Sequence, residues 1–459
     1  MKLQRTVWFC VVALVLSLPG VQAQAQGTGP IGPIGSRQLP IPAARGLDIE
    51  PSPADSPRPQ ADTHTLSSIE RLGIGSLGVV RSFADPAFRF NQSFDNGIVH
   101  NTNTSVSSLG ANLLFNHEAN RSHLAASYTG AHVLYYPNSI DAATFHTLAV
   151  SQEFRWARWV LRLRDDLLIS PEAAFGGLYT GGASSEIASQ SSTGVADTIL
   201  TQRANRVNNA GAGEVNYFLS RRSIMTFAGT YNTLDFTDAG AGYIDSHGVT
   251  GRVGYDYALA PKDSIGLTYN YSRTTYSGGH PLLRTDRVEL SYGRKVTGRM
   301  AFQVSAGPER VHSGSQNFLE WTLSTATTYQ TRRTRYSLAY THGISTGSGV
   351  FSGTDIHTVV AGVNYLLTQS WAASINSGYA FNRTLTPTAG QADSFGNWYG
   401  TASLVRGLGR HLRLVMNYGY QQQNNAAGAC PVAACGGAVR ARQIAGVTME
   451  WHPWSMMER

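Results

Sequence analysis

Hydrophobic and polar residues alternate along residues 263 to 276, DSIGLTYNYSRTTY. The apolar positions share one parity and the small polar positions the other, with Ile265, Leu267, Tyr269 and Tyr271 alternating with Ser264, Gly266, Thr268, Asn270 and Ser272. Because successive side chains of a β-strand point to opposite faces, this pattern predicts a strand with one apolar and one polar face. Soluble β-sandwiches contain such strands too, so repetition and strand length must decide the fold class.

The alternation recurs from about residue 84 to the end of the chain. It is clear in GVTGRVGYDYALA (248–260), in SWAASINSGYAF (370–381) and in HLRLVMNYGYQ (411–421). In each segment most of the large apolar residues share one face and most of the Gly, Ser, Thr, Asn and Arg residues lie on the other, although Gly251 lies on the apolar face and Val415 on the polar face. These strands reach or exceed the roughly 9–11 residues with which a tilted strand crosses a bilayer. The pattern therefore favours transmembrane strands over the ~5–6-residue strands of a soluble sandwich or propeller.

The connections between strands are of two kinds. Short turns are expected at 260–263, 296–299, 331–333, 367–370 and 407–410, and longer polar loops at 277–283, 347–353, 385–393 and 424–437. The two kinds alternate strictly in this interpretation, as in bacterial outer-membrane barrels, where short turns face the periplasm and long loops face outside. The predicted fold class is all-β: a transmembrane antiparallel up-and-down β-barrel.

The strand count follows from a parity requirement. The hairpins between residues 103 and 451 give about seventeen strands, whereas bacterial barrels close with an even number. The last strand and the short turns must both end in the periplasm, so one more strand is needed before residue 100, and DPAFRFNQSF (85–94) is the candidate. We therefore expect about 18 strands, with about 16 as the fallback.

The region from about residue 84 to Trp454 resembles a Gram-negative outer-membrane β-barrel of the porin-like class. The last strand, VRARQIAGVTMEWHPW, places Ala441, Ala445, Val447, Met449 and Trp451 on its outward face and ends in aromatic residues, as the terminal assembly signal of that class does. SMMER (455–459) follows as a short tail, where the class usually ends. The resemblance implies an outer-membrane location, contact with outer-membrane lipid and handling by the barrel-assembly machinery. It transfers no site residues.

The N-terminal part of the chain differs from the predicted barrel in composition. Lys2 and Arg5 precede the apolar run VWFCVVALVLSL, and VQAQAQ offers cleavage after Ala23 or Ala25, so residues 1–25 are predicted to be a signal peptide. Residues 26–83 are rich in Pro and Gly at first and are predicted to be a periplasmic arm with a possible periplasmic partner. Residues 84–454 then form the barrel. No later window reaches the ~20 consecutive apolar residues of a membrane helix.

Removal of the signal peptide also removes Cys10, so two cysteines remain in the mature chain. Cys430 and Cys435, in ACPVAACGG, are close enough to form a disulfide in an oxidising compartment. A zinc site would need further Cys or His ligands, and a lone CxxxxC supplies none. We therefore predict a disulfide between Cys430 and Cys435.

Catalytic, cofactor and nucleic-acid motifs are weak. Gly73, Gly75 and Gly78 spell GxGxxG, but no buried strand precedes them and no long helix follows, so no cofactor is expected. Asp165 and Asp166 point to opposite faces of a strand, more plausibly at a strand end than in a catalytic pair. DSHG (245–248) and THGIS (341–345) contain residue types of a catalytic triad, but neighbours this close in sequence rarely reach the geometry of nucleophile, base and orienting group. The 13 His are dispersed, which argues against a metal site, and no Lys/Arg block indicates nucleic-acid binding.

Charge is modest and predominantly arginine. Charged residues make up 14% of the chain, below the roughly 25% of soluble domains, and loss of Lys2 and Arg5 lowers the formal charge from +7 to +5. The polar strand faces are predicted to line a lumen with Arg252, Arg287, Arg413, Arg440, Arg442, Asp256, Glu289, Glu320 and Glu450. These charged residues either pair with one another as a structural ladder or create an electric field that filters ions. The loop 171–205 either folds into that lumen or lies outside.

The favoured function is a passive or weakly selective outer-membrane channel with a mild anion preference, which is not an enzyme. A first alternative is the barrel component of a secretion or cell-surface polysaccharide system, with the N-terminal arm reaching a periplasmic partner. A less favoured alternative is an outer-membrane hydrolase, which requires clustered Ser, His and Asp side chains or paired carboxylates at the barrel rim.

Overall fold

The computed structural model describes ten segments of the chain, all within one compact unit, Gln38–Arg459. They are residues 83–99, 102–136, 141–171, 205–237, 243–346, 351–368, 370–385, 394–409, 411–424 and 441–453. Among these residues, we find no helix of the length and apolarity that a membrane span requires.

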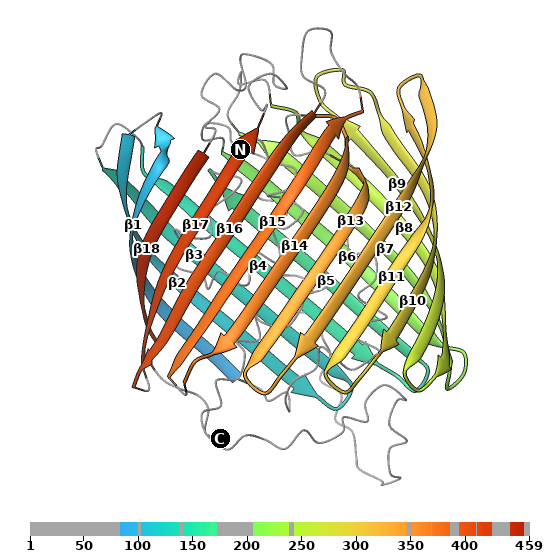
Figure 1. Ribbon diagram of the computed structural model, residues 1–459, viewed down its shortest axis with the longest axis horizontal. Helices are drawn as coiled ribbons and strands as arrows, with labels where there is room; N and C mark the ends of the chain where they lie inside the picture. Colours follow the sequence, from blue (N-terminus) through green and yellow to red (C-terminus); the bar gives the residue numbers. More distant parts are fainter. Residues whose placement is uncertain are drawn as a thin grey trace, which may run out of the picture. The chain divides into compact units, whose positions relative to one another are not determined.

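Eighteen antiparallel strands make up the described segments (Figure 1). Their bounds are β1 Phe83–Val99, β2 Thr102–Ala119, β3 Ser122–Tyr136, β4 Ala143–Arg155, β5 Trp159–Ser170, β6 Arg206–Phe218, β7 Ser223–Phe236, β8 Ser246–Ala260, β9 Asp263–Tyr276, β10 Leu283–Lys295, β11 Met300–Ser313, β12 Gln316–Gln330, β13 Thr334–Ser345, β14 Thr354–Leu366, β15 Trp371–Thr384, β16 Ser394–Leu408, β17 Leu412–Asn424 and β18 Ala441–Trp451. The predicted number of strands is confirmed.

The sheet closes on itself. Each strand pairs with its neighbours in sequence, and β1 pairs with both β2 and β18. At the seam between the first and last strands, Phe88 lies opposite Trp451 and Asp95 opposite Ile444. The strand predicted at 85–94 thus supplies the closing pair. Closure leaves no strand of the sheet without a partner on either side, which a sheet facing hydrocarbon requires because lipid cannot hydrogen-bond a bare edge.

The two faces of the strands match the predicted parity. Outward apolar side chains are highly exposed, as in Leu319 (71%), Leu109 (68%) and Ile375 (60%). On β18 the predicted outward residues Val447 and Met449 are exposed, and Thr448 between them is buried. A closed barrel with an apolar outer face and a polar inner face is the architecture of an outer-membrane protein, as the sequence predicts.

The connections follow the predicted alternation with two exceptions. Short turns join β2 to β3, β4 to β5 and each later even-numbered strand to the next, and from β8 onward they lie at the positions predicted from the sequence. On the opposite rim, however, β1 is followed by β2 after residues 100–101, and β11 by β12 after residues 314–315. The prediction of strict alternation was therefore wrong at these two places. Gly314 has a φ of 60°, a left-handed conformation that permits the tight turn after β11.

Candidate functional site

The candidate site is the polar inner face of the barrel, which lies opposite the exposed apolar face. Its side chains include a continuous charged row. The row runs across neighbouring strands, and each member lies directly opposite the next in the register. In order, the members are Glu153, Arg162, Glu214, Ala228, Arg252, Asn270, Arg287, Glu309 and Glu320. We call the wall from β4 to β12 that carries this row the charged wall.

The charged row climbs the wall. Glu153 lies two residues before the end of β4, next to the short turn at 156–158. Glu309 and Glu320 lie near the turn at 314–315, on the opposite rim. Because the strands are tilted (Figure 1), a row at right angles to them rises from one rim towards the other. Charges of both signs therefore lie at successive heights along one path.

Arginine and glutamate alternate in the lower part of the row and neutralise one another. Arg162 Nε lies 2.7 Å from Glu153 Oε2, and its Nη1 lies 3.3 Å from Glu214 Oε1. Arg155 also pairs with Glu153. The arginines are the more accessible partners, since the side chain of Arg162 is 37% exposed, whereas those of Glu153 and Glu214 are 15% and 25% exposed.

The middle of the row is more deeply buried. Arg287 Nε lies 3.5 Å from Glu289 Oε2, and the amide of Asn270 donates to the same carboxylate oxygen at 3.1 Å. Thr322 Oγ1 donates to the other oxygen of Glu289 at 3.3 Å. Arg252 is attracted by Glu214, Glu289 and Asp256 and repelled by Arg287. The network is typical of buried charge, which is tolerated only where partners and hydrogen bonds compensate for lost water.

A glycine makes room beside this network. A Cβ on Gly307 would clash with the carbonyl oxygen of Val288 on the neighbouring strand, so only glycine fits. The next residue, Pro308, has no N–H to donate, and the β10–β11 pairing omits Val288 and Glu289. The two backbones therefore approach closely at the point where Glu289 turns into the barrel.

The predicted lumen residues fall into three places. Arg252, Arg287 and Glu320 lie in the charged row. Glu289 lies two residues beyond Arg287, and Asp256 four residues beyond Arg252, on the same inward faces. Arg413 and Glu450 lie at the seam, and Arg442 lies higher on the same seam. Arg440, Cys430 and Cys435 are outside the described residues. The disulfide, the signal peptide, the arm 26–83, the tail 455–459 and the disposition of loop 171–205 stay predictions.

The lower end of the seam holds an ion cluster around Glu450. Arg89 Nη2 lies 2.7 Å and Arg413 Nη1 3.5 Å from this carboxylate. His452, just after β18, lies 2.9 Å from Asp85 on β1 and 3.8 Å from Glu450. The hydrogen bond to Asp85 and the nearby negative charge of Glu450 raise the pKa of His452 to about 9, which favours the imidazolium form. The cluster links β1, β17 and β18 where the barrel closes.

The upper part of the seam holds a second ion pair. Arg442 Nη2 lies 2.6 Å and its Nε 3.0 Å from Asp95 Oδ2, and both side chains are buried. Asp95 thus neutralises Arg442, one of the arginines predicted to line the lumen. The contribution of Arg442 to any field in the lumen is correspondingly small.

Strands β14 to β17 present a different chemistry. Within the described residues, the inward positions of β14, β15 and β16 carry no charged side chain. Buried amide and hydroxyl side chains occupy the inward face instead, and we call this part of the inner face, from β14 to β17, the amide wall. Its buried members include Ser374, Asn382, Asn397, Ser403, Asn417, Gln421 and Gln423. Ser374 and Ser403 are hydrogen-bonded at 2.7 Å, and Gln421 donates to Asn397 at 3.2 Å.

Several charged residues were missed from the sequence. They are Arg89, Asp95, Glu153, Arg162, Glu214 and Glu309, and strand parity alone could have found them on inward faces. The prediction that Asp165 and Asp166 mark a strand end was wrong, because both lie inside β5. Asp165 accepts a hydrogen bond from Asn209 and Asp166 pairs with Arg164, so each carboxylate has its own partner.

Metal-ligating side chains gather at one place among the described residues, and it is not in the lining. His342 and His357 lie with Asp355 on β13 and β14. They share the strand parity of the exposed Leu338 and Val359, which is the outward parity. The sequence argued against a metal site because the histidines are dispersed. Cross-strand pairing brings two of them together.

Comparison with known proteins yields structural similarity only. No family model matches the chain, and no curated protein does. Solved structures that resemble it include Pseudomonas aeruginosa OpdQ (10% identity, 81% of this chain and 99% of that chain, TM-score 0.41) and Pseudomonas aeruginosa OccK2 (OpdF) (9%, 81% and 98%, 0.42). Acinetobacter baumannii OccAB4 is also similar (8%, 80% and 97%, 0.40). Scores this low leave the function to be inferred from the barrel itself.

Proposed function

We propose that the protein is a passive, weakly selective outer-membrane channel with a mild anion preference. The observation that carries the proposal is the charged row, which keeps the inner face of the barrel polar from one rim towards the other and includes the accessible Arg162. A barrel of about 16–18 strands is wide enough for an aqueous path, whereas side chains fill one of about eight. Contact with outer-membrane lipid, handling by the barrel-assembly machinery and a periplasmic partner for the arm remain part of this proposal.

The anion preference rests on which charges face water. Along the row the signs nearly balance, since Arg162, Arg252 and Arg287 stand against Glu153, Glu214 and Glu309, whereas the carboxylate of Glu320 lies 3.9 Å from Arg383 of the outward face. Accessibility shifts the balance. The Arg413 side chain is 38% exposed and that of its partner Glu450 3%, and the Arg162 side chain is likewise more exposed than its partners. Exposed guanidinium groups over buried carboxylates should raise the local concentration of anions.

Conductance of the purified full-length protein in a planar bilayer tests the proposal. We expect discrete steps in symmetric salt and, in a salt gradient, a reversal potential with the sign of a weak anion selectivity. Heat-denatured protein from the same preparation is the control for contaminating channels. Folded protein that inserts but gives no steps would contradict the channel. Steps with cation selectivity would contradict the anion preference alone.

A further inference from the structure

We propose that His342, Asp355 and His357 form a binding site for a divalent transition metal such as Zn²⁺, on the outer surface of the barrel near the rim opposite the short turns. The proposal is independent of channel activity. Each residue offers one ligand atom, and these atoms lie within 4.8 Å of one another. Two imidazoles and one carboxylate are donors that suit Zn²⁺ and its first-row neighbours.

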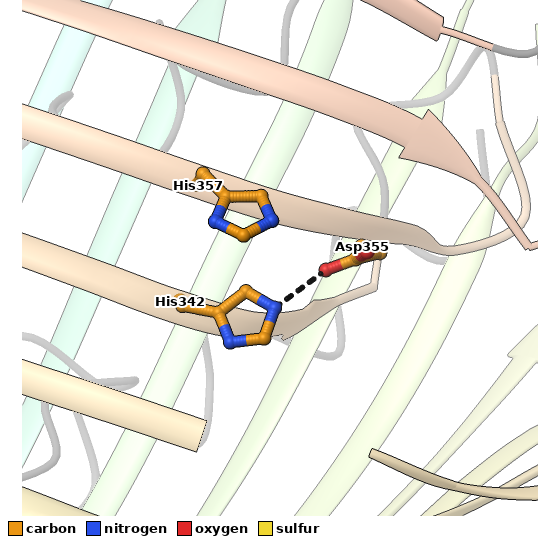
Figure 2. A group of neighbouring side chains, drawn as sticks. All are labelled: His342, Asp355 and His357. Carbon is orange, nitrogen blue, oxygen red and sulfur yellow. Dashed lines mark hydrogen bonds and ion pairs between the residues drawn. The ribbon is translucent and has the colours of Figure 1, made fainter. Parts of the chain in front are cut away.

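The strand register creates the cluster. His342 on β13 lies directly opposite His357 on β14, and Asp355 precedes His357 by two residues, which places it on the same face. The two rings stack with centroids 4.1 Å apart. Figure 2 shows both imidazoles beside the Asp355 carboxylate, each with a nitrogen turned towards it. His342 Nε2 lies 3.1 Å from Asp355 Oδ1.

The surroundings prepare the histidines for a metal. Tyr340 Oη lies 3.1 Å from His357 Nδ1, which fixes the ring and leaves Nε2 facing the cluster. This is the arrangement by which outer partners orient metal-bound imidazoles. Trp321 covers His342, with ring centroids 4.2 Å apart, and His342 is only 4% exposed. The Nδ1 atom of His342 is buried without a hydrogen-bond partner among the described residues.

Binding requires local changes that the geometry defines. Zn–N and Zn–O bonds of about 2.0–2.2 Å need ligand atoms closer together than 4.8 Å, so the stacked rings must rotate. The metal replaces the proton that His342 Nε2 shares with Asp355, and that proton is released to solvent. Arg383 lies 2.8 Å from Asp355 Oδ2 and 3.9 Å from Glu320, so one cation and one further carboxylate also act on the site. Because metal binding releases the proton of His342 Nε2, the affinity for the metal should increase with pH.

The position of the cluster indicates what a metal would do. Pairing between β12 and β13 ends at Leu323 and His342, although both strands continue towards the rim. Beyond this point β13 pairs only with β14 among the described strands. A metal held by His342, His357 and Asp355 would fasten β13 to β14 where support from β12 is lost.

Metal titration of the EDTA-treated full-length protein in detergent tests the site. We expect one Zn²⁺ per chain in competition with a chromophoric chelator, and the intense visible bands of tetrahedral Co²⁺ when Co²⁺ is used. The changes His342→Ala, His357→Ala and Asp355→Asn should each abolish this stoichiometric binding. Tyr340→Phe should weaken it about tenfold, as loss of an orienting partner does.

His146→Ala is the matched control. His146 stacks on Tyr128 and lies 2.9 Å from its hydroxyl, as His357 does with Tyr340, but no second histidine or carboxylate joins it in a metal-ligating group of the described residues. This variant should bind Zn²⁺ like the parent protein. Equal affinity in the parent and in a folded His342→Ala/His357→Ala variant would overturn the proposal, as would the absence of binding to the parent. If an alanine variant does not fold, Asp355→Asn and Tyr340→Phe decide.

Discussion

The charged wall and the amide wall meet the same structural demand with different chemistry. From β4 to β12, inward side chains form a row of arginines and glutamates, whereas from β14 to β17 they are mainly amides and hydroxyls. Both keep the inner face polar. Only the first creates an electric field across the barrel, because paired charges leave local potentials and neutral amides leave far weaker ones.

The two walls also differ in how they are stabilised. In the amide wall, the hydrogen bonds between Ser374 and Ser403 and between Gln421 and Asn397 each join only one pair of strands. In the charged wall, Arg162 serves two strands at once by binding Glu153 and Glu214. Removal of one member there leaves another charge without its partner, whereas removal of a hydroxyl leaves only a weaker hydrogen-bond deficit.

A charge moved from the charged wall to the lipid side should give the largest effect. Arg252 faces inward, and the next residue, Val253, is 40% exposed on the outward face in the middle of β8. The exchange Arg252→Val/Val253→Arg keeps composition and net charge but places a guanidinium against lipid. Near the midplane this costs roughly 2–4 kcal/mol. We expect impaired folding in a heat-modifiability gel.

Arg252→Val alone is the control for loss of the inward charge. It should fold better than the exchange variant, since valine at position 252 places no charge in lipid. Equal folding of the two variants would contradict the assigned faces of β8.

These faces were predictable from the sequence, but the charged row was not. Strand parity is local, so Arg252 and Glu289 could be placed inward from β8 and β10 alone. A shift of one strand by two residues preserves its faces yet breaks the row. The register that aligns Arg162 with Glu214 depends on connections whose lengths are not encoded by parity. For the same reason the sequence did not reveal the pairing of His342 with His357.

Neutralisation of the charged wall should change selectivity. One unit charge about 8 Å from a permeating ion in water contributes roughly 0.5 kcal/mol, which is about a two-fold change in relative permeability. Arg162→Gln should therefore shift the reversal potential towards cations by about that factor. Ser403→Ala in the amide wall should leave the reversal potential unchanged. Similar shifts in both variants would remove the functional distinction between the walls.

The contribution of the amide wall to stability can be tested at the hydrogen bond between Ser374 and Ser403. The Oγ atoms lie 2.7 Å apart and both residues are buried. Ser374→Ala should lower the free energy of unfolding by about 1 kcal/mol because it leaves the Ser403 hydroxyl unpaired. Ser374→Ala/Ser403→Ala should recover part of that loss. Additive losses in urea titrations of folded protein would show that the two hydroxyls act independently.

The smallest expected effect is the pH dependence of the seam between the two walls. His452 has a pKa of about 9 in the folded barrel because it is hydrogen-bonded to Asp85 and lies beside the Glu450 carboxylate. Its ordinary value is about 6.5, so folding favours the protonated form, and the stabilisation is complete below that value and is lost as pH rises towards the folded value. The site is partly open to solvent, which limits the effect to about 1 kcal/mol or less.

Heat-modifiability midpoints should therefore fall between neutral and alkaline pH in the parent protein and change less in His452→Gln. His280→Gln, in the β9–β10 connection on the opposite rim, is the matched control and should retain the parental dependence. If His452→Gln keeps the full pH dependence, then His452 does not stabilise the seam through its charge, and Glu450 is held by Arg89 and Arg413 alone.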